Sequence, residues 1–134
     1  MKSVYTFLAL LVGFNLCAAS KPNFIFIMLD DAGYGDFSCY GQELFKTPNI
    51  DRMAKQGQRM TQFYSGSTVC APARCSLMTG LHTGHCQVRG NREVQPEGQA
   101  PLDPGTETLP LILSKGGYKT GMFGKWGLGA PGSV

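Results

Sequence analysis

Three residues at fixed spacing, Cys70, Pro72 and Arg74, have the types needed for a reactive site. Pro is favoured in the first turn of a helix and Gly just past its end, so the sequence predicts a short helix over 72–79 that stops at Gly80. Cys70 then lies at or just before the helix N-terminus, where free N–H groups and the helix dipole favour an anion. Arg74 lies one turn further on and can face the same anion. The pattern indicates an electrophile or nucleophile beside an oxyanion pocket; the alternative is a buried structural Cys with a surface Arg.

Two adjacent carboxylates follow the first apolar run after the N-terminal segment. Residues 24–29 are six consecutive apolar residues rich in Phe and Ile, which is typical of a strand buried on both faces of a parallel sheet. Asp30 and Asp31 come directly after it, at the end of the strand where ligands bind in open α/β sheets. Adjacent carboxylates repel each other unless a cation or hydrogen-bond donors compensate, and Ca²⁺ or Mg²⁺ fits such oxygen ligands. The alternative is that one Asp caps the following turn.

A lysine and two histidines are the remaining candidates. Lys125 follows a short run of strand-forming residues, 118–123, and Gly124. A single Lys at such a position is usually a solvated surface charge. His82 and His85 are three residues apart, but nearby glycines predict a loop, which favours a solvated or hydrogen-bonded pair over two metal ligands.

Two further helices are marked by clear start and stop residues. Thr47 is the expected N-cap, Pro48 the first helical residue and Gly57 the stop of the first. The second is expected over 106–115, before Gly116. The side chains expected to face inward are Ile50, Met53 and Ala54 in the first helix and Leu109, Ile112 and Leu113 in the second.

Strands are predicted at 24–29, 58–64 and 118–123, with the helices between them. This order indicates an α/β fold with a mainly parallel sheet flanked by helices. Because the second strand leads into the Cys70 helix, Cys70 is expected at the same sheet edge as the two carboxylates. The Pro- and Gly-rich segment 92–105 is expected to be a surface excursion.

Length, charge and the N-terminus limit the classes of protein. The 134 residues allow one domain, and the scattered basic residues with a net charge of +3 indicate no nucleic-acid partner. Residues 1–19 resemble a secretory signal peptide, with Lys2, an apolar run over 4–16 and a small-residue cleavage site at 17–19. The apolar run is too short to span a bilayer, so no stable membrane insertion is expected after cleavage. We expect an exported protein, periplasmic or secreted, or in a eukaryote one of the endoplasmic reticulum or lysosome.

The cysteines do not define a disulfide. Export permits disulfides, but without Cys17 and Cys70 an odd number remains, so no pairing is predicted. The remaining cysteines are Cys39, Cys75 and Cys86.

The longer pattern around Cys70 resembles a signature of the sulfatase family. Residues 67–80 read Ser-Thr-Val-Cys-Ala-Pro-Ala-Arg-Cys-Ser-Leu-Met-Thr-Gly, a C-x-P-x-R followed by a short apolar run and Thr-Gly. In that family the Cys is converted to formylglycine by an enzyme that reads the Pro and the Arg. The strand-end Asp pair resembles the Ca²⁺-binding pair of sulfatases. Residues 117–126 resemble a second signature, whose Lys contacts the sulfate.

The resemblance implies an alkaline-phosphatase-like fold and hydrolysis of sulfate esters of small molecules or saccharides. Formylglycine at position 70 would be hydrated to a gem-diol and attack sulfur, Arg74 would hold the diol, and Lys125 would neutralise the sulfate. Ca²⁺, in preference to Mg²⁺, would be bound by Asp30, Asp31 and the modified Cys70. The implied catalytic residues are therefore Cys70, Arg74 and Lys125, and the implied maturation partner is the formylglycine-generating enzyme.

The sequence departs from the family's commonest pattern at two positions and covers only part of it. Phe123 fills a position that is usually small or aliphatic, and Gly127 stands where a His often follows the Trp. Residues 20–134 are expected to be the N-terminal portion of a truncated sulfatase domain, without the second metal-ligand pair, the His and the Lys that family members carry downstream. We expect this chain alone to have little activity. The alternatives are a formylglycine-dependent phosphonate monoester hydrolase or phosphodiesterase of the same superfamily, and a non-catalytic secreted fragment or pseudoenzyme.

Overall fold

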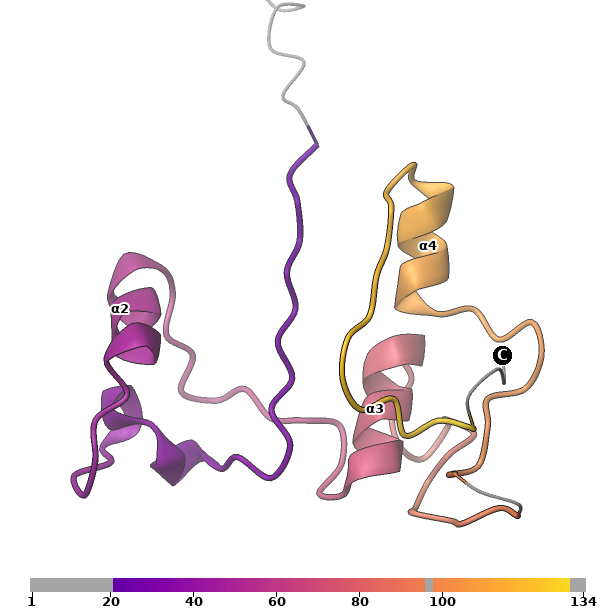
Figure 1. Cartoon of the computed structure of the whole chain (residues 1–134), viewed down its shortest axis with the longest axis horizontal. Helices are drawn as coiled ribbons and strands as arrows, with labels where there is room; N and C mark the ends of the chain where they lie inside the picture. Colours follow the sequence, from indigo (N-terminus) through magenta and orange to yellow (C-terminus); the bar gives the residue numbers. More distant parts are fainter. Residues whose placement is uncertain (1–20, 96–97, 131–134) are drawn as a thin grey trace, which may run out of the picture. The chain divides into compact units, whose positions relative to one another are not determined.

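The computed structural model of the chain describes residues 21–95 and 98–130 (Figure 1). The signal peptide expected over 1–19 lies outside these residues. The described residues belong to two units, which divide after Asp31. Across the described ranges, no helix combines the length and the apolar character needed to cross a membrane.

The described residues of the first unit, 21–31, belong to no strand. The apolar run that was predicted to be a buried strand is exposed instead: Ile25 is 89 % exposed, and Phe24, Phe26 and Ile27 are each more than half exposed. The prediction is wrong here for a physical reason. A strand buried on both faces needs hydrogen-bonded neighbours and covering helices, and an apolar sequence by itself supplies neither.

The second unit is helical, with almost no β-structure. In its described residues the one β-interaction is an isolated antiparallel bridge between Glu93 and Gln99. Segments 58–64 and 118–123, which were also predicted to be strands, are irregular. The mainly parallel sheet predicted from the sequence is therefore not formed in the described part of the chain, and a sheet edge is not what positions Cys70 there.

Two short 3₁₀ helices and α2 form one group of elements. They are η1 (Tyr34–Asp36), η2 (Ser38–Tyr40) and α2 (Pro48–Gln56). Helix α2 confirms the predicted start at Pro48 and stop at Gly57. The Thr47 hydroxyl does not cap the helix: it donates to Asp51 Oδ1 at 3.1 Å and accepts the Ser38 N–H at 2.9 Å, which joins η2 to α2.

The apolar stripe predicted for α2 is only partly buried. Ile50 and Ala54 are half-buried, but Met53 is 61 % exposed, so its assignment to the core is wrong. A periodic stripe predicts which face is apolar; burial also requires an element to cover that face.

Helices α3 (Cys70–Thr79) and α4 (Leu109–Lys115) contact each other. Helix α4 begins three residues later than predicted, after Thr108 as N-cap, and ends as predicted before Gly116. Two of its side chains predicted to face inward, Leu109 and Ile112, are 37 % and 51 % exposed. The helix is therefore covered less than its sequence pattern indicates.

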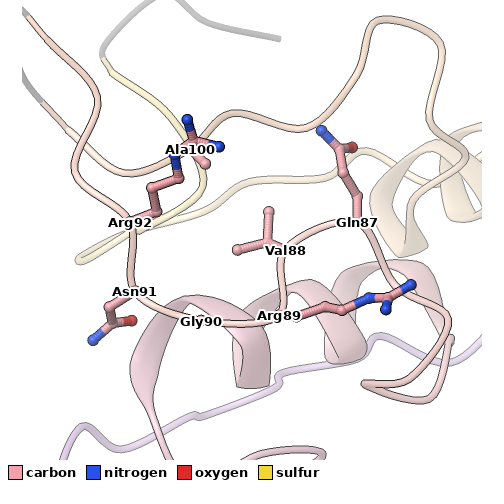
Figure 2. A pocket seen from close by; sticks show the side chains of 7 residues that line it. All are labelled: Gln87, Val88, Arg89, Gly90, Asn91, Arg92 and Ala100. Carbon is pink, nitrogen blue, oxygen red and sulfur yellow. The ribbon is translucent and has the colours of Figure 1, made fainter.

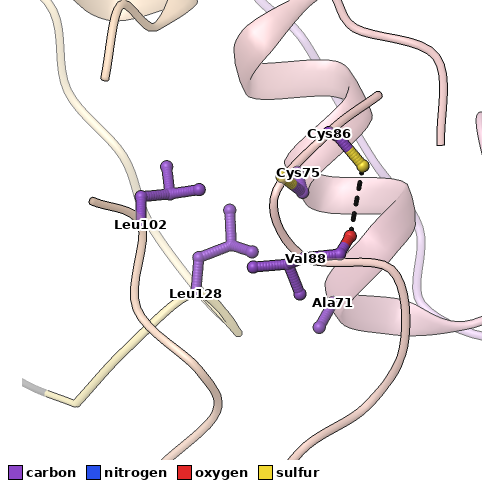
Figure 3. Packing of buried hydrophobic residues seen from close by; sticks show 6 residues of the cluster. All are labelled: Ala71, Cys75, Cys86, Val88, Leu102 and Leu128. Carbon is purple, nitrogen blue, oxygen red and sulfur yellow. Dashed lines mark hydrogen bonds between the residues drawn. The ribbon is translucent and has the colours of Figure 1, made fainter. Parts of the chain in front are cut away.

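The buried core lies between α3 and the irregular segments beside it (Figure 3). Trp126 packs against its edge, and the Cys86 thiol donates to the Val88 carbonyl oxygen at 3.2 Å. Burial raises the pKa of the Cys75 thiol. The cluster joins the start of α3, the segment after it and the last described segment of the chain; its members are Ala71, Cys75, Cys86, Val88, Leu102 and Leu128.

Candidate active site

Helix α3 places Cys70 in its first turn. Val69, the N-cap residue, has an extended backbone, and Cys70 is the first helical residue. Gly80 ends the helix with φ +69°, a left-handed conformation that glycine adopts without the strain of a Cβ atom. The helix begins two residues earlier than the predicted 72–79 and ends where it was predicted to end, and the placement of Cys70 at its N-terminal end is confirmed. The Cys70 side chain is half-buried.

Lys125 lies beside Cys70. The Lys125 Nζ donates to the Cys70 Sγ at 3.4 Å, although the two residues are 55 positions apart in the sequence. The structure therefore brings together two of the residues singled out from the sequence.

Arg74 reaches the same segment from inside the molecule. Its side chain is 9 % exposed, and its Nη1 donates to the backbone oxygen of Lys125 at 2.6 Å. The sequence placed Arg74 against the reacting anion; the hydrogen bond places it against the backbone of the lysine. Arg74 thus connects α3 to the segment that carries the ammonium group.

The residues after Lys125 pack closely on α3. Leu128 is fully buried in the core. Gly127 has φ +71°, and a Cβ atom built on it would lie 3.1 Å from Arg74 Cδ. Both the backbone conformation and the close approach favour glycine at the position where the family pattern often has His.

Asn91 was missed by the sequence reasoning. Its side-chain oxygen accepts the Ala71 N–H at 3.1 Å, in the first turn of α3 next to Cys70. One signal for such a residue was present in the sequence. Val69 offers no side-chain acceptor at the N-cap, so the helix start had to obtain its acceptor from elsewhere.

Asn91 also borders a cavity of about 290 Å³ formed by the segment after α3 and Ala100 (Figure 2). No carboxylate lines this cavity, and two arginines do. The Arg89 and Arg92 side chains leave the loop in different directions in Figure 2, and Arg89 Nε donates to the Cys86 carbonyl oxygen at 3.2 Å. The two guanidinium groups therefore do not converge on one ligand.

His82 and His85 lie in a turn, as the glycine-rich sequence predicted. His82 Nδ1 accepts the Gly84 N–H at 3.0 Å, and the two ring centroids are 6.4 Å apart. Both side chains are exposed. A hydrogen-bonded turn accounts for the pair.

Asp30 and Asp31 belong to the first unit, and both side chains are exposed. Asp31 has φ +56°, a left-handed conformation that Asp tolerates better than most residues. Two adjacent carboxylates offer up to four oxygen atoms, and Ca²⁺ takes about six to eight oxygen ligands. The donor chemistry fits a hard divalent cation.

Comparison with known proteins gives a consistent result. The family model described as Sulfatase matches residues 22–130. Arylsulfatase A of Bos taurus is 42 % identical over 130 residues, which are 96 % of this chain and 25 % of that protein. Arylsulfatase D of Homo sapiens is 41 % identical over 112 residues, 81 % of this chain and 19 % of that protein. N-acetylgalactosamine-6-O-sulfatase of Bacteroides thetaiotaomicron is 39 % identical over 112 residues, 83 % and 21 % of the two chains. The chain thus spans about a fifth to a quarter of the length of these relatives.

Proposed function

Because the chain belongs to the sulfatase family, whose fold is alkaline-phosphatase-like, we propose that it hydrolyses sulfate esters through formylglycine made from Cys70. The observation that carries this proposal is the approach of Lys125 Nζ to Cys70 Sγ at 3.4 Å. It joins the two segments that resemble sulfatase signatures, and it puts a cation beside the reacting position. The positive charge of the Lys125 ammonium group would stabilise the negative charge that develops on a bound sulfate group in the transition state.

The proposed reaction has two covalent steps. One hydroxyl of the hydrated aldehyde at position 70 loses its proton and attacks sulfur, and the S–O bond to the alcohol breaks, so that the alcohol leaves with a proton. The second hydroxyl then loses its proton, the C–O bond to sulfate breaks, and the aldehyde is restored. A thiol cannot perform the second step because it lacks the second hydroxyl.

Lys125 and Arg74 have different proposed roles. The Lys125 ammonium group stabilises the charge that develops on the sulfate oxygens. Arg74 holds the Lys125 backbone through its hydrogen bond at 2.6 Å, and its charge adds to the positive potential around the diol. The close packing of Gly127 on the Arg74 side chain supports this fixed geometry.

Asp30 and Asp31, with the modified Cys70, are the proposed Ca²⁺ ligands. When bound, the cation favours ionisation of a nearby hydroxyl and screens sulfate oxygens. We expect Asp31→Asn to weaken Ca²⁺ binding, because an amide replaces a charged ligand. Calorimetric titration with Ca²⁺, and with Mg²⁺ for comparison, measures this. Equal Ca²⁺ affinity in the variant would remove Asp31 from the ligand set.

The relatives favour sulfate over phosphorus esters, because the three proteins above are all named as sulfatases. Their names include both arylsulfatases and a saccharide sulfatase, so both substrate classes belong in the assay. The signal-like residues 1–19 support export, and conversion of Cys70 requires the formylglycine-generating enzyme as a partner.

Mass spectrometry of the peptide that contains Cys70 is the first test, on protein secreted from a host that makes formylglycine. Ordinary cysteine oxidation adds mass, whereas conversion to formylglycine removes about 18 Da. We expect the loss. Because this chain alone is expected to have little activity, we expect slow hydrolysis of an aryl sulfate, still above the rate of the Cys70→Ala variant. An unmodified thiol, or equal rates for the two proteins, would favour a non-catalytic protein. Faster hydrolysis of a phosphonate monoester than of any sulfate ester would favour the related phosphonate hydrolases.

A further inference from the structure

The first turn of α3 lacks a capping side chain of its own. The N–H groups at the start of a helix have no partner within the helix. Here Ala73 N–H already bonds to the Val69 oxygen at 3.1 Å, and Pro72 has no N–H. Among the first helical residues, the N–H groups of Cys70 and Ala71 remain, and Val69 at the N-cap position has no side-chain acceptor for either. Ala71 is 0 % exposed, so water does not replace the missing partner.

Asn91 supplies this partner from a distant part of the sequence. Its Oδ1 accepts the Ala71 N–H at 3.1 Å across 20 positions of sequence. The Ala71 N–H and the Cys70 carbonyl belong to one planar peptide group. Val88, three positions before Asn91, is in the buried core, so the segment that carries Asn91 is itself anchored.

We propose that Asn91 is a positioning residue for the nucleophile at position 70, an inference that rests on the proposed function. The Asn91 bond fixes the peptide group after Cys70 to the segment 87–92. The Arg74 bond fixes the backbone of Lys125. Together the two bonds set the position of the reacting group relative to the ammonium group. Because misplacement by about 1 Å can cost about a hundredfold in rate, such a tether affects turnover more than substrate affinity.

The first experiment compares Asn91→Leu with Asn91→Asp, with rates divided by the formylglycine content of each protein. Leu has a similar size and no acceptor, so we expect kcat for an aryl sulfate to fall about tenfold or more with KM little changed. Asp keeps the acceptor, and its charge is favourable at a helix N-terminus, so we expect kcat near that of the wild type. Equal kcat in Asn91→Leu and the wild type would overturn the proposal.

A second-site variant separates positioning from simple capping. Val69→Ser places a hydroxyl at the N-cap, and because Pro72 has no N–H, its partner is the Ala71 N–H that Asn91 otherwise binds. We expect Asn91→Leu alone to lower Tm, because the Ala71 N–H loses its partner. In the Val69→Ser, Asn91→Leu double variant we expect Tm to return to within roughly 2 °C of the wild type. We expect kcat to stay low in the double variant, because the tether to segment 87–92 is still absent. Recovery of both Tm and kcat would mean that Asn91 only caps the helix, and would overturn the proposal.

Amide hydrogen exchange at Ala71 gives a measurement that does not depend on turnover. We expect slow exchange in the wild type and in Asn91→Asp, faster exchange in Asn91→Leu and slow exchange again in the double variant. Unchanged exchange of the Ala71 amide in Asn91→Leu would overturn the positioning role of Asn91, and the proposed function would remain. The opposite result is also possible. If the wild-type protein carries formylglycine and shows the expected exchange but hydrolyses no sulfate ester, the proposed function is overturned and the tether is not.

Discussion

Lys125 makes two contacts with α3, one through its side chain and one through its backbone. The ammonium group meets Cys70, and the carbonyl oxygen accepts a hydrogen bond from Arg74. The backbone of Lys125 is therefore fixed by Arg74, and its ammonium group is fixed beside Cys70. A solvated surface lysine, the ordinary interpretation of a single Lys in a sequence, has neither restraint.

Replacing the lysine side chain distinguishes the effect of the ammonium group from that of the backbone hydrogen bond. Lys125→Met keeps the backbone bond and much of the side-chain length but removes the charge, so we expect kcat for an aryl sulfate to fall by about 10²–10³. Steady-state kinetics on protein of known formylglycine content measures the effect. Lys119→Met, which removes an exposed lysine from the same segment, is the matched control and is expected to keep the wild-type rate. A wild-type rate in Lys125→Met would make Lys125 a surface charge.

Gly127 predicts a steric effect on Arg74. Gly127→Ala adds a Cβ atom 3.1 Å from Arg74 Cδ at φ +71°, so we expect lower stability and a displaced Arg74. Gly105→Ala is the matched control, because Gly105 has φ +82° and nothing within 4 Å of a Cβ atom. We expect thermal unfolding to show a loss of Tm in both variants, and a fall in turnover only in Gly127→Ala. A His at 127 meets the same contact, so it is not expected to raise the rate. Equal turnover in the two Ala variants would argue against the close packing.

At the scale of elements, the junction of η2 and α2 depends on a carboxylate. The Ser38 hydroxyl donates to Asp51 Oδ2 at 2.6 Å, and the Thr47 hydroxyl donates to Oδ1. The hydrogen bond from Ser38 is the main cause that lowers the pKa of Asp51 below its ordinary value of 3.8. Because the folded-state pKa is the lower one, the stabilisation is complete above pH 3.8 and is lost as the pH falls through the folded-state value.

We therefore expect acid to open this junction. Exchange of the Ser38 amide, which donates to the Thr47 hydroxyl, should lose protection below about pH 3.8, measured relative to its intrinsic rate at each pH. Asp51→Asn should exchange faster at neutral pH and lose this pH dependence. Glu43→Gln, at an exposed carboxylate, serves as the control and should behave as the wild type. The same acid response in Asp51→Asn would assign the effect to another group.

The helices were predictable because their signals are local. Pro48, Gly57 and Gly80 act within one turn of the helix ends they mark, and the structure places those ends where the sequence did. The strands were not predictable in the same way, because a strand forms only with a partner in register. The run 24–29 has an ideal composition for a buried strand, yet its side chains are exposed. The α2 and α4 stripes are only partly buried for a related reason: the elements that would cover them lie elsewhere in the sequence.

The site was predictable only in part. The resemblance pointed to Cys70, Arg74 and Lys125, and the structure brings these three together. The hydrogen bond from Arg74 to the Lys125 backbone oxygen could not be predicted from the sequence, because every residue has a carbonyl oxygen that could accept it. Asn91 carried no motif, and its significance depends on a bond across 20 positions.

At the scale of the molecule, the buried core of the described residues includes near neighbours of both Cys70 and Lys125. Leu128 is fully buried and belongs to the same cluster as Ala71 and Cys75 of α3. We expect Leu128→Ala to lower the free energy of unfolding by about 2–5 kcal/mol, because it leaves a cavity. Leu44→Ala, at a side chain that is 93 % exposed, should change it by less than about 0.5 kcal/mol. Urea unfolding of the two variants tests this. Equal effects would mean that the cluster is not the stabilising core.

The two buried thiols of this core can be used to measure the fraction of folded molecules. The structure describes four free cysteines, of which Cys75 and Cys86 are fully buried and Cys39 and Cys70 are half-buried. A brief pulse of an alkylating reagent should therefore mark Cys39 and Cys70 in the native protein and reach Cys75 and Cys86 only when the core opens. Conversion of Cys70 removes one site that reacts with the reagent. A single mass spectrum after the pulse then reports maturation and folding of each molecule together.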